Sequence, residues 1–281
     1  MESHKTFIDL IQERNSCRSY AGQKIEGVKM NLLNAFIADI HSEAAEKSIH
    51  ARFQIVTRQD GSAKAQGKMG TYGFISGADA FLVGILPKSE ACVEQFGLLF
   101  EKIVLFATSL GLATCWLGGS FNRADFQLQA DLSEQEFIPI VSPIGYARDR
   151  RTLFDQLVRL TAGSGARKPW SELFFNLSPL QPLDRDTAGA YAVPLDMVRL
   201  GPSASNKQPW RVIKDPDGFG FYLSRTRGYR VAGYDIQRND LGIAMCHFEL
   251  TCRELDLPGR WEVREARNSS DDLQYIVSWT L

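Results

Sequence analysis

Two arginines flank a serine at alternating positions near the start of the chain, in the segment Arg14-Asn-Ser16-Cys-Arg18. In an extended segment successive side chains point to opposite faces, so these three would lie on one side. Guanidinium groups donate paired, permanently charged hydrogen bonds to phosphate oxygens, and a hydroxyl between them adds a donor. The segment is therefore a candidate phosphate clamp. The alternative is a pair of ordinary surface arginines at a helix end.

A second candidate is the segment 200–210, which reads Leu-Gly-Pro-Ser-Ala-Ser-Asn-Lys-Gln-Pro-Trp. A predicted helix ends at Gly201, small polar residues follow, and Pro209 opens a predicted strand. Such a loop exposes backbone N–H groups, hydroxyls and amides, which suit phosphate oxygens and the polar edge of a heteroaromatic ring. The alternative is a structural turn in which Trp210 caps the core.

With three further segments, these two motifs resemble those of the FMN-dependent nitroreductases. Residues 14–18 are similar to the R-x-S-x-R opening of that family, and residues 202–210 to its P-S-x-x-N-x-Q-P-W motif. Residues 111–119 and 139–146 resemble its glycine-rich loop and the strand after it, and residues 166–169 resemble its basic R-K-P stretch. The resemblance covers most of the chain. It implies an α+β, nitroreductase-like fold that binds FMN.

The order of these motifs departs from that of the family. An ordinary nitroreductase chain carries all of them, and two identical chains build two flavin sites across their interface. Here residues 1–178 lack P-S-x-x-N, whose expected place is held by residues 41–46, and residues 179–281 carry it without either basic motif. The resemblance is thus to the small single-chain, tandem branch. It implies two related halves, 1–178 and 179–281, packed as an intramolecular pseudo-dimer.

This arrangement implies one complete flavin site per chain, with both basic motifs contributed by the first half and P-S-A-S-N by the second. The opposite site would join residues 111–119 to a half without arginines, so we assign that loop to structure. The family pattern also places backbone contacts to the flavin in segment 71–73. The candidate cofactor-binding residues are Arg14, Ser16, Arg18, Arg167, Lys168, Pro202, Ser203, Ser205, Asn206, Gln208, Thr71, Tyr72, Gly73, Pro258 and Gly259.

The elements that position these motifs are predicted from hydrophobic spacing and turn residues. Helices are expected at 5–14, 26–40 and 94–110, in a segment ending at 200, and from about 241. Strands are expected at 52–57, 80–86, 137–142, 210–214, 219–224 and 274–280. Residues 176–190, rich in turn-formers, are a predicted linker.

The second half repeats part of the first. Aligning Gly97 with Gly242 also aligns four other pairs of identical residues: Leu105 with Leu250, Leu110 with Leu255, Leu112 with Leu257, and Trp116 with Trp261. Two copies indicate a pseudo-dimer rather than a solenoid.

Composition and absent motifs narrow the possible functions. The net charge is −1, which gives no basic footprint for a nucleic acid. The five cysteines form no CxxC pair and the four histidines no zinc-ligand spacing, so no metal is expected, and His247 is predicted to be a core histidine. Dinucleotide, P-loop and nucleophile-elbow motifs are also missing. Residues 1–16 are charged throughout, and no apolar stretch is long enough to span a bilayer, so a cytoplasmic protein without a membrane partner is expected.

The sequence therefore predicts an FMN-dependent oxidoreductase that uses NADH or NADPH to reduce a nitroaromatic or quinone-like small-molecule acceptor by two electrons. No side chain is assigned as a catalyst, because the flavin and solvent can deliver the protons. The alternatives are a flavin-binding protein for storage or sensing that does not turn over, and a structural protein without flavin. Because the chain contains its own pseudo-twofold partner, we expect a monomer or a weak homodimer.

Overall fold

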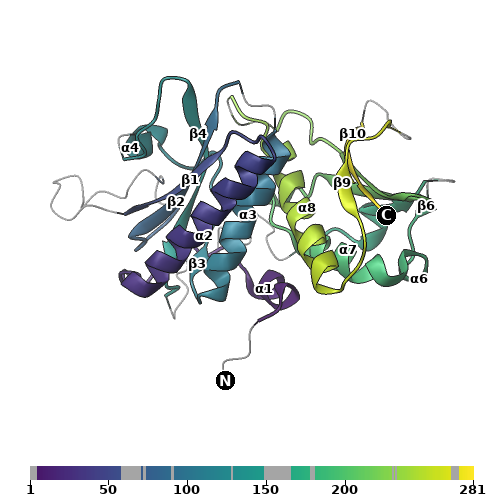
Figure 1. Ribbon diagram of the computed structural model, residues 1–281, viewed down its shortest axis with the longest axis horizontal. Coiled ribbons are helices and arrows are strands. Elements are labelled where there is room, and N and C mark those ends of the chain that lie inside the picture. The colour runs from purple at the N-terminus through teal and green to yellow at the C-terminus, as the bar shows by residue number, and fades with distance from the viewer. Residues whose placement is uncertain are drawn as a thin grey trace. The chain divides into compact units, whose positions relative to one another are not determined.

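The computed structural model describes residues 5–57, 71, 74–89, 92–127, 129–148, 166–177, 181–229, 231, 233–266 and 272–281 (Figure 1). The chain divides into two compact units. The first unit is Glu13–Thr161, and the second unit joins Met1–Gln12 to Ala162–Leu281. Each unit has its own β-sheet and its own pair of packed helices.

The first unit is a four-stranded antiparallel sheet with order β1-β2-β4-β3. Its elements are α2 (Gly27–Glu46), β1 (Arg52–Thr57), β2 (Ala80–Pro87), α3 (Val93–Ser109), β3 (Ala113–Thr114), α4 (Arg123–Gln127) and β4 (Glu136–Gly145). Strand β2 is buried almost throughout, and α2 and α3 pack side by side (Figure 1). Gly84 permits the close approach of α3 to β2, because a Cβ there would lie 2.4 Å from the Phe96 ring.

The second unit is a six-stranded sheet with order β6-β5-β7-β8-β10-β9. Its elements are α1 (Phe7–Glu13, of which the last residue belongs to the first unit), the 3-10 turn η2 (Trp170–Glu172), β5 (Phe174–Asn176), β6 (Gln181–Pro182), α6 (Arg185–Ala188), η3 (Gly189–Tyr191), α7 (Ala192–Leu200), η4 (Ala204–Asn206), β7 (Trp210–Asp215), β8 (Gly218–Leu223), α8 (Ile236–Glu254), β9 (Arg260–Glu262) and β10 (Gln274–Thr280). Strands β5 and β7 are parallel, and the other pairs are antiparallel. Helices α7 and α8 pack together.

The two units repeat one topology. The first runs α2-β1-β2-α3-β3-β4, with α4 inserted before β4, and the second contains α7-β7-β8-α8-β9-β10. The sheet orders β1-β2-β4-β3 and β7-β8-β10-β9 correspond strand for strand. The aligned tryptophans play matching parts: the indole of Trp116 donates to Glu101 of α3 (2.7 Å), and that of Trp261 to Glu249 of α8 (2.9 Å). The predicted repeat and the α+β class are therefore confirmed.

Most predicted elements occur close to their expected bounds, and the differences have local causes. Helix α2 continues to Glu46, beyond the predicted end at 40. Helix α8 begins at Ile236 rather than near 241, because the Asp235 side chain caps it by accepting from Arg238 N. Helix α3 ends at Ser109, and Gly111 follows with φ +73°, as its glycine predicted.

The boundary between the compact units, at Thr161/Ala162, differs from the predicted boundary between the halves at 178/179. Strand β5 pairs with β7, and this places residues 174–176 in the second sheet although they precede the predicted boundary at 178. The predicted linker 176–190 was wrong, because it contains β6, α6 and the first two residues of η3. The halves 1–178 and 179–281 remain a prediction about sequence relationship.

Candidate functional site

The arginine-containing segment follows α1, and its residues Ser16, Ser19 and Tyr20 form isolated β-bridges in the first unit. Ser16 bridges to Thr114 in parallel, and the N–H of Cys17 donates to Thr114 O (2.9 Å). On its other side, the N–H of Ser76 donates to Arg18 O (2.9 Å). The segment is thus fixed on both sides at residues 16–18, so the side chains of Ser16 and Arg18 project from defined backbone positions.

Arg14 is a buried cation with unused donors. Its side chain is 4% exposed, and its Nε lies 3.7 Å from Oε1 of Glu101, which is fully buried. That separation is too long for a hydrogen bond. Within the described part of the chain, Nε and Nη1 of Arg14 have no hydrogen-bond partner. Leaving such donors unsatisfied is costly, so the site suits an anionic ligand that brings acceptor oxygens.

Arg18 and Ser16 are partly exposed. Among the described residues, the Arg18 guanidinium makes no hydrogen bond or ion pair, so its donors are open to a ligand. Together with Arg14, the segment offers two guanidinium groups and a hydroxyl, the donor set expected of a phosphate site.

The P-S-A-S-N loop of the second unit holds an unusual backbone. Ser205, Asn206 and Gln208 all have positive φ, at 47°, 54° and 48°. Each non-glycine residue in this region is strained, and such a run persists only where its surroundings determine it. Two contacts do so: Asp240 Oδ2 accepts from Ala204 N (3.0 Å), and Ser203 Oγ accepts from Gln208 N (2.9 Å).

The same loop accepts hydrogen bonds from the basic stretch, residues 166–169. Arg167 Nη1 donates to Asn206 Oδ1 (2.7 Å), and its Nη2 donates to Leu200 O (3.0 Å). The N–H of Lys168 donates to Gln208 Oε1 (2.9 Å). The structure thus brings together the two motifs that were predicted to share one site. The amides of Asn206 and Gln208 hold the basic stretch in place, and their direct contact with a flavin stays a prediction.

Positive charge gathers beside this loop. Burial lowers the pKa of Lys168, and the nearby cations Arg211 and Lys207 lower it further while Glu172 opposes them. Burial also lowers the pKa of Arg211. We call Arg167, Lys168, Lys207 and Arg211 the cationic cluster. Partly buried cations that repel one another are stabilised by a bound anion.

Of the remaining candidates in the second unit, Pro202 is buried, whereas Ser205 is exposed and its Oγ lies 3.0 Å from the Tyr229 hydroxyl. Pro258 O accepts from the Trp279 indole (3.0 Å), and a Cβ on Gly259 would lie 2.0 Å from Trp279 Nε1. This pair therefore packs against Trp279 in the structure, and its contact with a flavin stays a prediction.

In the first unit, Thr71 is buried and its carbonyl accepts from Phe74 N (2.8 Å). Tyr72 and Gly73 lie outside the described residues. The loop 111–119 is tied into the sheet: Cys115 N donates to Ser142 Oγ (3.1 Å), in keeping with the structural role assigned to it.

Other chemistry finds little support in the described part of the chain. No group of three or more His, Cys, Asp or Glu side chains there could hold a metal ion. His247 is fully buried with Nδ1 2.9 Å from Met197 O, which confirms it as a core histidine. No helix among the described residues is long and apolar enough to cross a membrane.

The sequence patterns did not identify two residues that contact the P-S-A-S-N loop. Asp240, fully buried on α8, anchors Ala204, and Tyr229 contacts Ser205. Asp240 looks like an ordinary polar residue near the start of a helix, and Tyr229 belongs to no motif. Neither position carried a signal that spacing could detect.

Comparison with known proteins agrees with this architecture. A profile of the family described as "Putative TM nitroreductase" matches residues 6–252. A solved structure from Thermotoga maritima, described as a "putative nitroreductase", has a TM-score of 0.62 and 19% identity, covering 100% of this chain and 96% of its own.

Partial matches include a "nitroreductase family protein" from Clostridium difficile (TM-score 0.44, 19% identity, 60% of this chain and 96% of its own). A "putative nitroreductase" from Bacillus subtilis has a TM-score of 0.45 and 18% identity, covering 59% of this chain and 96% of its own. No curated protein matches the chain. The structural likeness shows the fold, and the profile shows the family: the chain belongs to this nitroreductase family and is an oxidoreductase.

Proposed function

We propose that the chain binds one FMN and passes two electrons from NADH or NADPH to a small-molecule acceptor. The observation that carries this proposal is Arg14, a buried guanidinium whose Nε and Nη1 make no hydrogen bond within the described part of the chain, in a segment that resembles the nitroreductase phosphate clamp. Arg18, with no ion pair among the described residues, and the cationic cluster add the charge that a phosphate monoester requires.

Each unit by itself offers donors that suit FMN. The first unit supplies the guanidinium groups of Arg14 and Arg18, and the second supplies the cationic cluster and the exposed hydroxyl of Ser205. Asn206 acts on Arg167 by fixing its guanidinium. From the order of the motifs in the sequence, we propose a stoichiometry of one FMN per chain.

Bound FMN supplies hydride and electron transfer, and the protein binds and orients the reactants. In the overall reaction, NAD(P)H, a proton and a quinone give NAD(P)⁺ and a hydroquinone. With a nitro acceptor, the same two electrons and two protons give a nitroso product and water. Both reactions balance without a side-chain acid, so no catalytic residue is proposed. A cytoplasmic monomer or weak homodimer, with neither nucleic acid nor membrane as a partner, completes the proposal.

The central test removes the phosphate contacts. Arg14→Ala and Arg18→Ala each remove charge-assisted hydrogen bonds worth roughly 1.5–3 kcal/mol, which corresponds to a loss of about tenfold to a hundredfold in FMN affinity. Riboflavin lacks the phosphate, so its affinity should change far less. Flavin fluorescence quenching measures both affinities. Arg253→Ala is the matched control, because that side chain is 63% exposed and lies outside both donor sets. Wild-type FMN affinity in both arginine variants would remove the proposal.

A double variant tests whether the two basic motifs, which contain Arg18 and Arg167, act on one flavin. Asn206→Ala should weaken FMN binding by releasing Arg167. Combined with Arg18→Ala, its effect should be less than additive if both act on one phosphate network. Full additivity would indicate two separate anions. Steady-state oxidation of NADH and NADPH with menadione then separates an enzyme from a storage or sensing protein, which would hold FMN without turnover.

A further inference from the structure

Lys168 of the cationic cluster has a fixed backbone and a reachable ammonium group. Its N–H donates to Gln208 Oε1 (2.9 Å), and its carbonyl accepts from Arg199 Nε (2.8 Å). Pro169 restricts the backbone of the residue before it. Among the described residues, Nζ of Lys168 makes no hydrogen bond or ion pair, and the side chain is only partly buried. The side chain thus starts from a fixed point and ends in a nitrogen that a ligand can reach.

Arg211 is the first of two cations held beside Lys168, close enough to lower its pKa. Its Nη1 donates to Gln208 O (3.1 Å) and to Trp210 O (2.6 Å). These bonds fix the guanidinium, whereas its Nε and Nη2 make no hydrogen bond within the described part of the chain. Such donors suit the oxygen atoms of a phosphate group.

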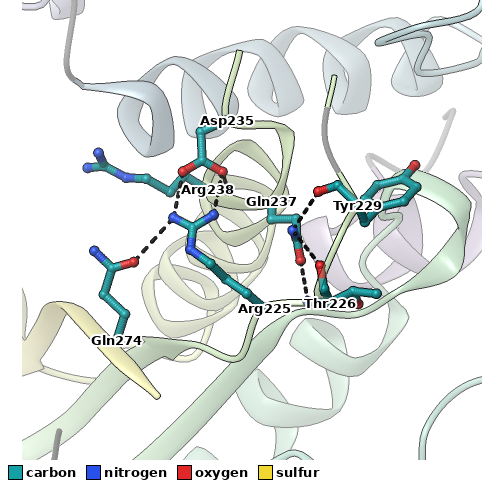
Figure 2. Close-up of polar contacts among 7 residues, drawn as sticks. All are labelled: Arg225, Thr226, Tyr229, Asp235, Gln237, Arg238 and Gln274. Atoms are coloured by element: carbon teal, nitrogen blue, oxygen red, sulfur yellow. Dashed lines mark hydrogen bonds and ion pairs between the residues drawn. The ribbon is translucent and has the colours of Figure 1, made fainter. Parts of the chain in front are cut away.

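The second cation, Lys207, is positioned through Tyr229. Its Nζ lies 5.8 Å from the centre of the Tyr229 ring, within the range of a cation–π contact. Figure 2 shows Gln237 holding that tyrosine: its Nε2 donates to Tyr229 O (3.0 Å), and its Oε1 accepts from Thr226 N (2.7 Å). Because Gln237 is 3% exposed, water competes little for these bonds. The ammonium group of Lys207 is therefore held at a defined place on the loop.

The surroundings of Lys168 favour its neutral amine. Burial lowers the pKa of Lys168, Arg211 and Lys207 lower it further, and Glu172 opposes them. More of the amine is then uncharged at neutral pH than in an ordinary surface lysine. An uncharged amine beside other cations is a typical lysine nucleophile. The cluster thus joins a nucleophile to groups that attract phosphate.

We propose that Lys168 is an acylation site for acyl phosphates, small molecules in which an acyl carbon is bonded to a phosphate oxygen. Arg211 and Lys207 hold the phosphate, and the acyl carbon meets Nζ of Lys168. The lone pair of Nζ forms the new C–N bond, the C–O bond to the phosphate breaks, and inorganic phosphate leaves with that electron pair. The nitrogen loses one proton to phosphate or water. The product is an uncharged amide, so one positive charge is lost from the cluster.

The acylation does not rest on the proposed function, but its consequence for flavin binding does. Lys168 is also a candidate contact of the FMN phosphate, so FMN and an acyl phosphate would compete for the same cations. Loss of the Lys168 charge should therefore weaken FMN binding. Acylation of this one amine would make flavin loading depend on the supply of acyl phosphates.

The test incubates the full chain, without added flavin, with acetyl phosphate at neutral pH. Mass spectrometry measures the rate of acetylation at each lysine. Lys214 is the internal reference, because it is partly buried in the same unit and its Nζ donates to Thr187 O (2.7 Å). Lys168 should be acetylated roughly fivefold faster or more, as expected of a lysine activated by neighbouring cations. Equal rates at the two lysines would overturn the inference.

Variants separate the effect of the cluster from general reactivity. Lys207→Gln and Arg211→Gln should each slow acetylation of Lys168, because the phosphate is held less strongly and the amine is protonated more. Arg253→Gln is the matched control, since it removes one charge at a side chain that is 63% exposed and outside the cluster, and it should change nothing. Lys207→Gln provides the test if Arg211→Gln does not fold. Wild-type rates in both cluster variants would contradict the proposal.

The acyl donor and FMN supply two further arms. Acetyl-coenzyme A carries its phosphates far from its acyl carbon, so it should show no preference for Lys168, and the same preference as with acetyl phosphate would refute guidance by the cations. Saturating FMN should protect Lys168 from acetyl phosphate. Fast acetylation that FMN does not slow would count against FMN at the cluster and leave the acylation site standing. FMN binding with equal acetylation of Lys168 and Lys214 would refute the site and leave the proposed function standing.

Discussion

Asp240 offers a sharp test of how the P-S-A-S-N loop is held. This carboxyl group is fully buried on α8, where its Oδ2 accepts from Ala204 N (3.0 Å). Burial raises its pKa well above the usual range. The hydrogen bond from Ala204 opposes the increase, and the nearby Asp235 adds to it. We therefore expect Asp240 to hold a proton in the folded chain at pH values where the unfolded chain has lost it.

The sign of the pH dependence follows directly. The pKa of Asp240 in the folded chain lies above its unfolded value of about 4. At pH values above about 4 the folded chain therefore binds more protons than the unfolded chain. Wild-type stability should then fall by up to about 1.4 kcal/mol per pH unit until the folded-state pKa is reached. Asp240→Asn keeps an oxygen acceptor for Ala204 and does not titrate. Its free energy of unfolding should match the wild type near pH 4 and exceed it increasingly above.

Urea unfolding followed by tryptophan fluorescence at several values between pH 4 and 8 measures this difference, and contributions from other titrating groups cancel in it. Asp240→Leu is the control, because it leaves Ala204 N without its acceptor and should lose about 1–3 kcal/mol even at pH 4. A difference between wild type and Asp240→Asn that stays constant with pH would refute the reasoning. A variant that becomes less stable than wild type as pH rises would show that the loop needs a charged carboxylate.

Two further predictions concern the fold. Arg52 donates to both carboxylate oxygens of Glu136, each at 2.8 Å, and holds the pKa of Glu136 at about 2, below its usual 4.5. This contribution is present above pH 4.5 and lost as the pH falls toward 2. Glu136→Gln should therefore cost about 1 kcal/mol at pH 7 by denaturant unfolding and progressively less in acid, and an undiminished cost near pH 2 would contradict the assignment. Gly259→Ala should cost about 3 kcal/mol or more, because its Cβ would lie 2.0 Å from Trp279 Nε1 at φ +135°. Gly233→Ala, at φ +74° with open space around it, should lose only about 1 kcal/mol, and equal losses would argue against close packing at Gly259.

The long elements could be predicted because their apolar faces recur over several turns or alternate along a strand. Strand β3 has only two residues and exists through its pairing with β4, so it leaves no pattern in the sequence. The first turn of α8 was missed for another reason: Gln237 and Asn239 are polar yet buried. Hydrogen bonds to Thr226 and Tyr234 take the place of apolar packing there.

For the candidate site, residue types identified the arginines and the P-S-A-S-N loop, since guanidiniums and hydroxyls are recognisable phosphate ligands. The spacing of residues in the sequence could not show that Asn206 accepts a hydrogen bond from Arg167, because the two are 39 positions apart. It also could not show that Tyr229 lies beside Ser205, 24 positions away along the chain. These features depend on contacts between distant segments, which form only when the chain folds.

The contacts of helix α1 determine when the second unit can finish folding during translation. The N–H groups of Phe7 and Ile8 donate to the carboxylate of Glu254, at the end of α8 and as many as 247 positions away. At a translation rate of about 5–20 residues per second, roughly 12–50 s separate the synthesis of these partners. Throughout that interval Leu10 and Ile11, buried in the finished protein, have not reached their final surroundings. The second unit is therefore completed only after Glu254 has been made, although Phe7 and Ile8 leave the ribosome long before it.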